Sequence, residues 1–268
     1  MPAGLAIVVP HHRRRDLLDG ALASAAGWPI LVVDDSPAGL PPGALPAGVE
    51  RVRTSGSSGF ARACNAGLDA VQRAGFPRTL LLNDDARLQP GCVALLLAAL
   101  EADPGAGAAG PLLLDPAGRV ESAGLALSPR SGRLRQRSRP PRGISEVDAV
   151  SGACVLLGSG ERFDERFPFG CEDVELCRRL RRAGRRVLLV PEARCEHAGG
   201  ASLSRRSREA TRHALHGHLL LLEERAWQQP LALGLALAQV LREGGPPERL
   251  LGLWEGWCDA RRGSTSGS

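Results

Sequence analysis

The chain has 268 residues, and 43% of them are hydrophobic, which is enough for one large domain or two small ones. The formal net charge is only +5, and only 3% of the residues are aromatic, so the strong basic footprint and stacking platforms of nucleic-acid-binding proteins are missing. A mild positive charge suits an anionic small molecule or a membrane surface. All 34 basic residues are arginines and only two asparagines occur, so a single arginine carries little information, whereas Asn65 and Asn83 carry more.

The cysteines and the N-terminal segment indicate in which cellular compartment the protein is expected. Seven cysteines, an odd number without regular spacing, predict reduced thiols. The chain passes from Met1 directly to a strand-like segment without a signal peptide. No apolar run reaches the ~18 residues of a transmembrane helix. We therefore expect a cytoplasmic protein.

In chain order, short apolar runs alternate with helical segments over residues 5–102. The predicted strands are residues 5–9, 30–33, 49–53 and 79–82. The predicted helices are residues 14–26, a helix that residues 56–59 open and that runs to about residue 74, and a helix that begins at residues 90–91 and runs to about residue 102. Continuous apolar runs are typical of strands that are buried on both faces. The alternation predicts an α/β fold in which helices cover both faces of a parallel sheet.

Polar residues follow three of these four strands. They are Pro10-His11, Asp34-Asp35 and Asn83-Asp84-Asp85. One such cluster would be compatible with an ordinary turn, but the carboxyl ends of parallel strands meet at one edge, where ligands bind. Oxygen ligands from Asp and Asn suit hard cations such as Mg²⁺ or Mn²⁺, and these ions suit a diphosphate.

The second half of the chain is less regular. Residues 119–143 are rich in arginine, serine, glycine and proline and predict an irregular excursion, either a solvated loop or an anion-facing flap. Further along, we expect a helix over 172–183, a strand over 186–190 that Pro191 ends, and helices over 205–228 and 231–242. Residues 263–268 have the composition of a disordered tail.

Several motifs stand in a recognisable order. They are Asp34-Asp35-Ser36, residues 59–67, Leu82-Asn83-Asp84-Asp85, Gly152-Ala153, residues 163–167, residues 169–180 and Pro191-Glu192-Ala193 leading to residues 197–202. This order resembles the family 2 glycosyltransferases, which are inverting bacterial enzymes, and within them the rhamnosyltransferase-like branch. The resemblance covers roughly residues 5–225.

The resemblance implies a GT-A fold, with a mostly parallel nucleotide-binding sheet flanked by helices and followed by C-terminal helices. The catalytic domain would span residues 1–204. Its donor half would end near residue 115, and its acceptor half would cover residues 116–204. A C-terminal helical extension would cover residues 205–262.

The resemblance also implies a donor site. Its nucleotide-sugar-binding residues would be Pro10, Asp34, Gly59, Asn65, Asn83 and Asp84, and its metal ligands Asp85 and His197. Asp34 would accept a hydrogen bond from the pyrimidine base, and Gly59 would let the backbone approach the nucleotide. Asn83 and Asp85 occupy the outer positions of the Asp-x-Asp motif, whose divalent ion, Mn²⁺ or Mg²⁺, offsets charge on the leaving diphosphate.

The acidic pair Glu172-Asp173 begins a predicted helix, where a carboxylate could simply cap the N-terminus. The resemblance implies instead that Asp173 is the general base that takes a proton from the acceptor hydroxyl. Glu172 would then orient the acceptor. These roles belong to an inverting transfer in a single displacement.

The implied function is metal-dependent transfer of a sugar, with rhamnose as the first candidate, from a dTDP- or UDP-sugar to a saccharide or lipid-linked acceptor in cell-surface glycan synthesis. A basic, amphipathic C-terminal region would suit contact with the inner membrane face, although simple helix packing would explain it too. The oligomeric state is open.

Three alternatives stay open. A structural zinc site would require Cys171, Cys177, Cys195 and His197 to converge without a close C-x-x-C pair. A sugar nucleotidyltransferase would typically carry a glycine-rich loop after the first strand, and His11–Arg15 contains no glycine. A non-catalytic nucleotide-binding relative would not need the intact Asn83, Asp85, Asp173 and His197.

Overall fold

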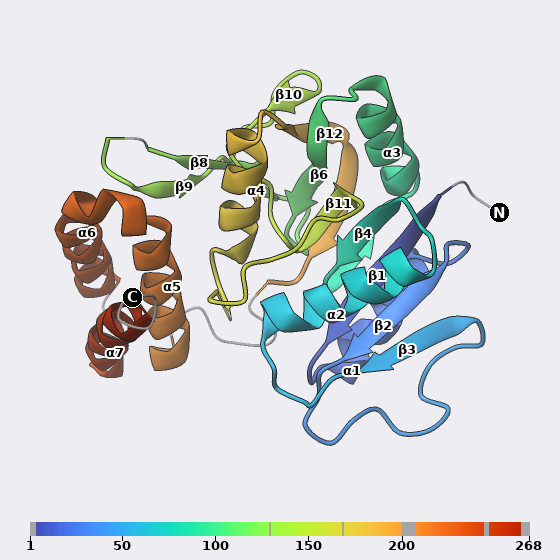
Figure 1. The fold of residues 1–268 in the computed structure, drawn as a ribbon, viewed down its shortest axis with the longest axis horizontal. Coiled ribbons are helices and arrows are strands. Elements are labelled where there is room, and N and C mark those ends of the chain that lie inside the picture. Colours follow the sequence, from blue (N-terminus) through green and yellow to red (C-terminus); the bar gives the residue numbers. More distant parts are fainter. Residues whose placement is uncertain (1–3, 129, 168, 200–206, 244–246, 264–268) are drawn as a thin grey trace.

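The computed structural model describes residues 4–128, 130–167, 169–199, 207–243 and 247–263. Helices cover both faces of a central sheet, and a group of C-terminal helices lies beside it (Figure 1). Ten strands of the described chain form this sheet, in the order β10-β12-β6-β11-β4-β1-β2-β3, with β5 on β12 and β7 on β6. The predicted α/β class is therefore confirmed.

The strands are β1 Leu5–His11, β2 Ile30–Asp34, β3 Val49–Arg53, β4 Arg78–Leu82, β5 Ala86–Leu88, β6 Ala106–Leu114, β7 Val120–Ser122, β8 Leu125–Leu127, β9 Leu134–Gln136, β10 Ser145–Glu146, β11 Cys154–Gly158 and β12 Arg186–His197. The helices are α1 Arg15–Ser24, α2 Phe60–Arg73, α3 Cys92–Ala102, α4 Glu172–Arg182, α5 Arg208–Leu221, the 3-10 helix η1 Glu223–Gln228, α6 Gln229–Arg242 and α7 Glu248–Gly263.

The N-terminal half matches the predicted parallel sheet. Strand β1 pairs in parallel with both β2 and β4, and β2 pairs in parallel with β3. Along β1, Leu5, Ile7 and Val9 enter the core on one face, whereas Ala6 and Val8 enter the core on the other. Burial on both faces explains why this strand is a continuous apolar run.

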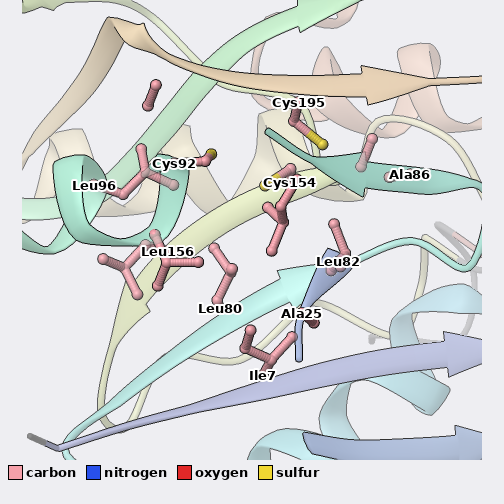
Figure 2. Packing of buried hydrophobic residues seen from close by; sticks show 14 of the residues in the cluster. Ile7, Ala25, Leu80, Leu82, Ala86, Cys92, Leu96, Cys154, Leu156 and Cys195 are labelled. Carbon is pink, nitrogen blue, oxygen red and sulfur yellow. The ribbon is translucent and has the colours of Figure 1, made fainter. Parts of the chain in front are cut away.

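The two cores separate the helices by face. Helices α1 and α3 pack on one face, where Figure 2 shows Ile7, Leu80 and Leu156 from three strands in one apolar cluster with Leu96 of α3. Helices α2 and α4 pack on the other face. A Cβ atom at Gly67 of α2 would lie 2.4 Å from a methyl carbon of Val8, so glycine permits α2 to approach the sheet closely.

The longest strands were the hardest to predict. The nine-residue β6 consists largely of Ala, Gly and Pro, so it lacks the β-branched signal that marks strands. The prediction that Pro191 ends its strand is wrong, because β12 continues to His197. A register shift between Val190 and Arg194 absorbs the proline, which cannot donate to the strand ladder.

The expectation of an irregular excursion is wrong for much of the arginine-rich segment. It contains β7 and the antiparallel β8–β9 hairpin. The backbone carbonyl groups of Arg130 and Gly132, at the hairpin turn, accept hydrogen bonds from Gln228 and His218. The hairpin therefore docks on the C-terminal helices, as Figure 1 also shows.

The C-terminal helices form their own small core from Leu215, Leu219, Leu222, Ala232, Val240 and Leu253. The predicted helix over 205–228 is wrong beyond Leu221, because η1 follows and Arg225 has non-helical dihedral angles. Helix α7 packs on α5 through Gly252 and Gly256, whose added Cβ atoms would lie 2.4 and 2.5 Å from α5 carbonyl oxygens.

No helix in the described ranges combines the length and hydropathy needed to cross a bilayer. The domain boundary predicted at residue 204 and most of the predicted tail, residues 264–268, lie outside the described residues. The division into donor and acceptor halves stays a prediction.

Candidate active site

Parallel strands bring the predicted polar clusters to one edge of the sheet. His11, at the end of β1, is opposite Asp34, at the end of β2, and Asn83 follows the neighbouring β4. Pro10 is buried within β1 just before this edge. The polar groups at the carboxyl ends of these strands are thus gathered as the sequence predicts.

Asp34 is fully buried, and its carboxylate is held by protein groups. Its oxygens accept hydrogen bonds from the hydroxyl of Ser36, the backbone N–H groups of Ser36 and Leu40, and the guanidinium of Arg51 at 2.6 Å. Burial raises the pKa of Asp34, but these hydrogen bonds outweigh it and lower the pKa to about 2. The carboxylate is therefore ionised. Its predicted hydrogen bond with the pyrimidine base of the nucleotide stays a prediction.

Asp35 organises the segment that precedes α2. Its carboxylate accepts hydrogen bonds from Thr54, from the N–H and hydroxyl groups of Ser58, and from the N–H of Gly59 at 3.3 Å. Gly59 has φ +97°, a conformation that favours glycine, and it caps α2. Asp35 was not predicted as a site residue, although its place beside Asp34 and the polar residues 54–58 could have indicated it.

In the acidic cluster after β4, Asp84 has a hydrogen-bond partner within the protein and the side-chain oxygen of Asn83 has none. Asp84 is buried and accepts a hydrogen bond of 2.7 Å from Nδ1 of His11, which was not predicted as a site residue. The side-chain oxygen of Asn83 is buried without a partner. A buried acceptor without a partner is costly, so this oxygen is suited to a ligand or a cation.

Asp85 and His197 meet because β5 pairs with β12. His197 is opposite Ala86 in this register, and its Nε2 atom lies 3.3 Å from Asp85 Oδ1. Its Nδ1 atom donates to Glu121 of β7 at 2.8 Å. Burial lowers the pKa of His197, but hydrogen bonds to Asp85 and Glu121 outweigh it and raise the pKa to about 10.

Side-chain oxygen and nitrogen atoms that could bind a divalent metal ion lie close to Asp85. Within the described residues, no cluster of three or more His, Cys, Asp or Glu side chains is placed to bind an ion. However, Asp85 and His197 are in contact, and the orphaned oxygen of Asn83 belongs to the same turn. This donor set fits Mn²⁺ or Mg²⁺. Glu121 orients His197 in the way that outer carboxylates orient metal-binding histidines.

The acidic pair begins α4, as predicted. Asp173 is partly exposed, and its Oδ2 atom accepts a hydrogen bond of 2.9 Å from the N–H of Gly152. Its other oxygen accepts from the N–H of Val174. Burial raises the pKa of Asp173, although these hydrogen bonds counteract the rise. Asp173 is therefore a stronger base than an ordinary aspartate.

Glu172 is more deeply buried than Asp173, and its Oε2 atom has no hydrogen-bond partner. Burial and the charge of Asp173 raise its pKa to about 8. Adjacent Cys171 has φ +69°, a left-handed conformation that is strained for a residue other than glycine. A Cβ atom at Gly217 of α5 would lie 2.3 Å from the carbonyl oxygen of Gly170, so α5 presses closely on this turn.

We expect Glu172→Gln to change the pH dependence of stability. Because the folded-state pKa is raised, the carboxyl stabilises the fold fully below its ordinary pKa of 4.5 and loses that contribution as the pH rises towards 8. The free energy of unfolding of the variant relative to the natural chain should be higher at pH 9 than at pH 5, by about 2 kcal/mol or more. Urea denaturation at both pH values measures this, with Glu175→Gln as a control in the same helix; an equal difference at both pH values would contradict it.

Asn65 is buried and ties α2 to the segment that precedes α4. Its amide donates to the carbonyl of Phe163 and to Glu165, both at 3.0 Å, and its oxygen accepts from the N–H of Phe163 at 2.9 Å. Both ends of the side chain are therefore used within the protein. The predicted contact of Asn65 with the nucleotide stays a prediction.

We expect Asn65→Ala to lower the free energy of unfolding by about 2–4 kcal/mol, because it leaves backbone groups of buried Phe163 without partners. Urea denaturation would measure the loss. Gln72→Ala is the control, since Gln72 is exposed on the same helix. Equal stability of the two variants would show that these hydrogen bonds contribute nothing.

The zinc hypothesis is contradicted by the fold. Cys177 belongs to the core on one face of the sheet and Cys195 to the core on the other. Figure 2 places Cys195 instead beside Cys92 and Cys154, among aliphatic side chains. The four zinc ligands therefore cannot converge.

A cavity of about 320 Å³ lies between the β8–β9 hairpin, α4 and α5. Its lining includes Leu125, Arg178 and Leu222, and none of the predicted site residues. The candidate site residues therefore lie outside this cavity.

The sheet is mostly parallel, and side chains with oxygen and nitrogen atoms that suit a metal ion lie at its carboxyl edge. A pair of carboxylates begins a nearby helix. This combination is typical of GT-A glycosyltransferases. The chain belongs to the family described as "Glycosyltransferase like family 2", whose model matches residues 43–216. It is therefore an enzyme of the glycosyltransferase class, and the nucleotidyltransferase and non-catalytic alternatives are set aside.

The chain is 28% identical to an N-acetylglucosaminyl-diphospho-decaprenol L-rhamnosyltransferase of Mycobacterium tuberculosis, across 86% of this chain and 87% of that protein. It also resembles a structure of GalNAc-T7 with UDP, GalNAc and Mn²⁺ (TM-score 0.60, 16% identity), covering 82% of this chain and 47% of that one. A mannosyltransferase from Pyrobaculum calidifontis with GDP-Man and Mn²⁺ is similar too (TM-score 0.55, 17% identity), covering 92% of this chain and 78% of that one. At these identities the two structures show the shared fold.

Proposed function

We propose that this chain is a metal-dependent, inverting glycosyltransferase that transfers rhamnose from dTDP-rhamnose to a lipid-linked saccharide in cell-wall glycan synthesis. The observation that carries the proposal is the Asp173 carboxylate, held by the N–H of Gly152 at 2.9 Å, partly exposed and with a raised pKa. A partly exposed carboxylate with a raised pKa can accept a proton from a sugar hydroxyl, which supports the proposal.

The donor and acceptor are inferred from relatives. The mycobacterial protein is named as a rhamnosyltransferase acting on N-acetylglucosaminyl-diphospho-decaprenol, a lipid-linked sugar, and the two enzymes align over most of both chains. Two similar structures contain a nucleotide or nucleotide sugar with Mn²⁺. A UDP-sugar is the second candidate donor.

In the proposed reaction, Asp173 removes the proton from the acceptor hydroxyl while that oxygen attacks the anomeric carbon of the donor. The bond from this carbon to the diphosphate oxygen breaks as the new glycosidic bond forms, so the configuration inverts. The hydrogen bond from Gly152 fixes one oxygen of Asp173, and the strained turn at Cys171 sets the direction of the pair. Glu172, protonated near neutral pH, can donate a hydrogen bond to the acceptor.

The donor would bind across the carboxyl edge of the sheet. Asp85 and His197 would hold the divalent ion with the oxygen of Asn83, and His197, which is protonated in the absence of metal, would release its Nε2 proton on binding. When bound, this ion offsets the negative charge that develops on the leaving diphosphate. Asp34 and the Gly59 segment, with Pro10, would lie around the nucleoside, and Asp84 would be held in place by His11.

Thermal-shift measurements with a panel of nucleotides and nucleotide sugars test the donor assignment. We expect dTDP and dTDP-rhamnose to raise the melting temperature in the presence of Mn²⁺, and to do so much less after chelation. Stabilisation by GDP alone, or an equal shift without metal, would contradict the proposed donor site.

A further inference from the structure

Exposed apolar side chains concentrate on the C-terminal helices. Ten large hydrophobic side chains are exposed in the described chain, and seven of them lie between Trp227 and Trp254. The two tryptophans are 70% and 65% exposed. A concentration of large exposed apolar side chains indicates an interaction site.

Part of this surface is one stripe along α6. Leu231, Gly234, Ala238 and Leu241 recur at helical spacing and are all exposed, and Trp227 lies one turn ahead of them. The opposite side of α6 places Ala232 and Val240 in the helical core. No charged residue occurs between Arg225 and Arg242 in the sequence. Below, "the α6 stripe" means Trp227, Leu231, Gly234, Ala238 and Leu241.

Helix α7 adds a second exposed group, made of Leu250, Leu251 and Trp254. An ion pair of 2.8 Å between Glu243 and Arg249 joins the end of α6 to the start of α7. Leu241 and Leu250 therefore lie at the same end of the helical group. Residues 244–246, which connect the two helices, lie outside the described residues.

The basic helix α5 is engaged elsewhere. Arg208 pairs with Glu255 at 3.0 Å, and Arg212 pairs with Asp259 at 2.6 Å, both on α7. Leu215 and Leu219 are buried in the helical core. The basic and apolar character of α5 therefore serves packing within the helical group, and the free apolar face belongs to α6 and α7.

We propose that the α6 stripe and the exposed group of α7 insert into the interfacial layer of a phospholipid bilayer. A helix with one continuous apolar face lies in the plane of the membrane surface, and tryptophan prefers the level of the headgroups. Arg242, which is exposed, lies at the C-terminal end of the stripe, where a guanidinium group can contact lipid phosphates. This inference rests on the proposed function, because a lipid-linked acceptor is reached at such a surface.

A second copy of the chain suits the stripe less well. In a twofold pairing of two α6 stripes, Gly234 and Ala238 at the centre would bury little apolar area, whereas a stable dimer needs a large buried area. Residues 207–263 contain seven arginines and seven acidic residues. Because this region is balanced in charge, insertion of apolar side chains should dominate binding, which should therefore largely survive high salt.

Flotation of the full chain with vesicles of phosphatidylcholine and phosphatidylglycerol tests the surface. We expect the natural chain to float with vesicles at both low and high salt, and L231Q/L241Q to bind at least about tenfold more weakly. Leu95→Gln, which exchanges an exposed leucine of α3 in the same way, is the control and should bind like the natural chain. Fluorescence of the exposed tryptophans should shift to the blue with vesicles.

Failure of the natural chain to float, or equal flotation of L231Q/L241Q, would overturn the proposal. So would sedimentation velocity showing a dimer that L231Q/L241Q dissociates without any vesicle binding, since the stripe would then serve a second copy. Thermal shifts with dTDP and Mn²⁺ are measured on the same variants. If L231Q/L241Q no longer floats but dTDP and Mn²⁺ still raise its melting temperature, the substitutions affect only the membrane-binding surface. If dTDP and Mn²⁺ do not raise the melting temperature of the natural chain, the result contradicts the proposed function and not the membrane-binding surface.

Discussion

Asp173→Asn should lower the turnover number of sugar transfer by about 10³-fold or more, because the amide cannot accept the proton of the acceptor hydroxyl. The amide oxygen can still accept the hydrogen bond from Gly152, so the fold and donor site should persist. The affinity for the donor nucleotide with Mn²⁺ should therefore stay within about twofold of that of the natural chain. Initial rates and isothermal titration on the same preparation measure both quantities.

Glu175→Gln is the matched control, since it makes the same chemical exchange two residues further along α4. Glu175 forms an ion pair with Arg179 on the surface of that helix. We expect this variant to keep nearly full turnover. Normal turnover by Asp173→Asn, or an equal loss in both variants, would remove Asp173 from the role of base.

Asp85→Ala should weaken nucleotide binding in the presence of Mn²⁺ by at least about tenfold, since even the outer groups of metal sites contribute that much to affinity. The variant also removes the carboxylate that lies 3.3 Å from His197. Affinity measured after chelation should change little, because the loss acts through the metal. Titrations of dTDP with and without Mn²⁺ give the comparison.

Asp103→Ala serves as the control for this experiment. Asp103 precedes the opposite, amino-terminal end of β6 and pairs with Arg186, so its loss should leave nucleotide binding unchanged. Metal-dependent affinity that is the same in Asp85→Ala and the natural chain would contradict the role of Asp85.

The sequence predicted the N-terminal half of the fold well, because its signals are local. Strands such as Ile30–Asp34 are short apolar runs between polar turns. Strand β6 was missed because close packing required small residues there: a Cβ atom at Gly110 would lie 2.6 Å from Val150. Such positions are set by neighbours distant in the sequence, which no local pattern reveals.

The positions of the candidate site residues in the fold were predicted where these residues follow strands or begin helices. Asp34 and Asn83 lie at strand ends and Asp173 at a helix start, as the pattern indicates. The sequence placed His11 at this edge but did not show its hydrogen bond to Asp84. Glu121 could not be predicted, because β7 brings it to His197 through a tertiary contact. The resemblance supplied His197, and strand register explains its contact with Asp85.

For the C-terminal region, the sequence predicted the helices but not which of their surfaces is exposed. Its composition predicted helices and suggested a basic face, but composition does not show which arginines find partners. The ion pairs of Arg208 and Arg212 with α7 use the charge within the helical group, and the uncharged α6 stripe is the exposed surface.

The most direct test of the central claim is the product formed from dTDP-rhamnose, Mn²⁺ and a lipid-linked N-acetylglucosamine acceptor, analysed by NMR for the configuration of the new linkage. We expect a rhamnosyl product whose anomeric configuration is opposite to that of the donor, and none from Asp173→Asn. A product with retained configuration, or no transfer by the natural chain under conditions where dTDP and Mn²⁺ bind, would contradict the assignment.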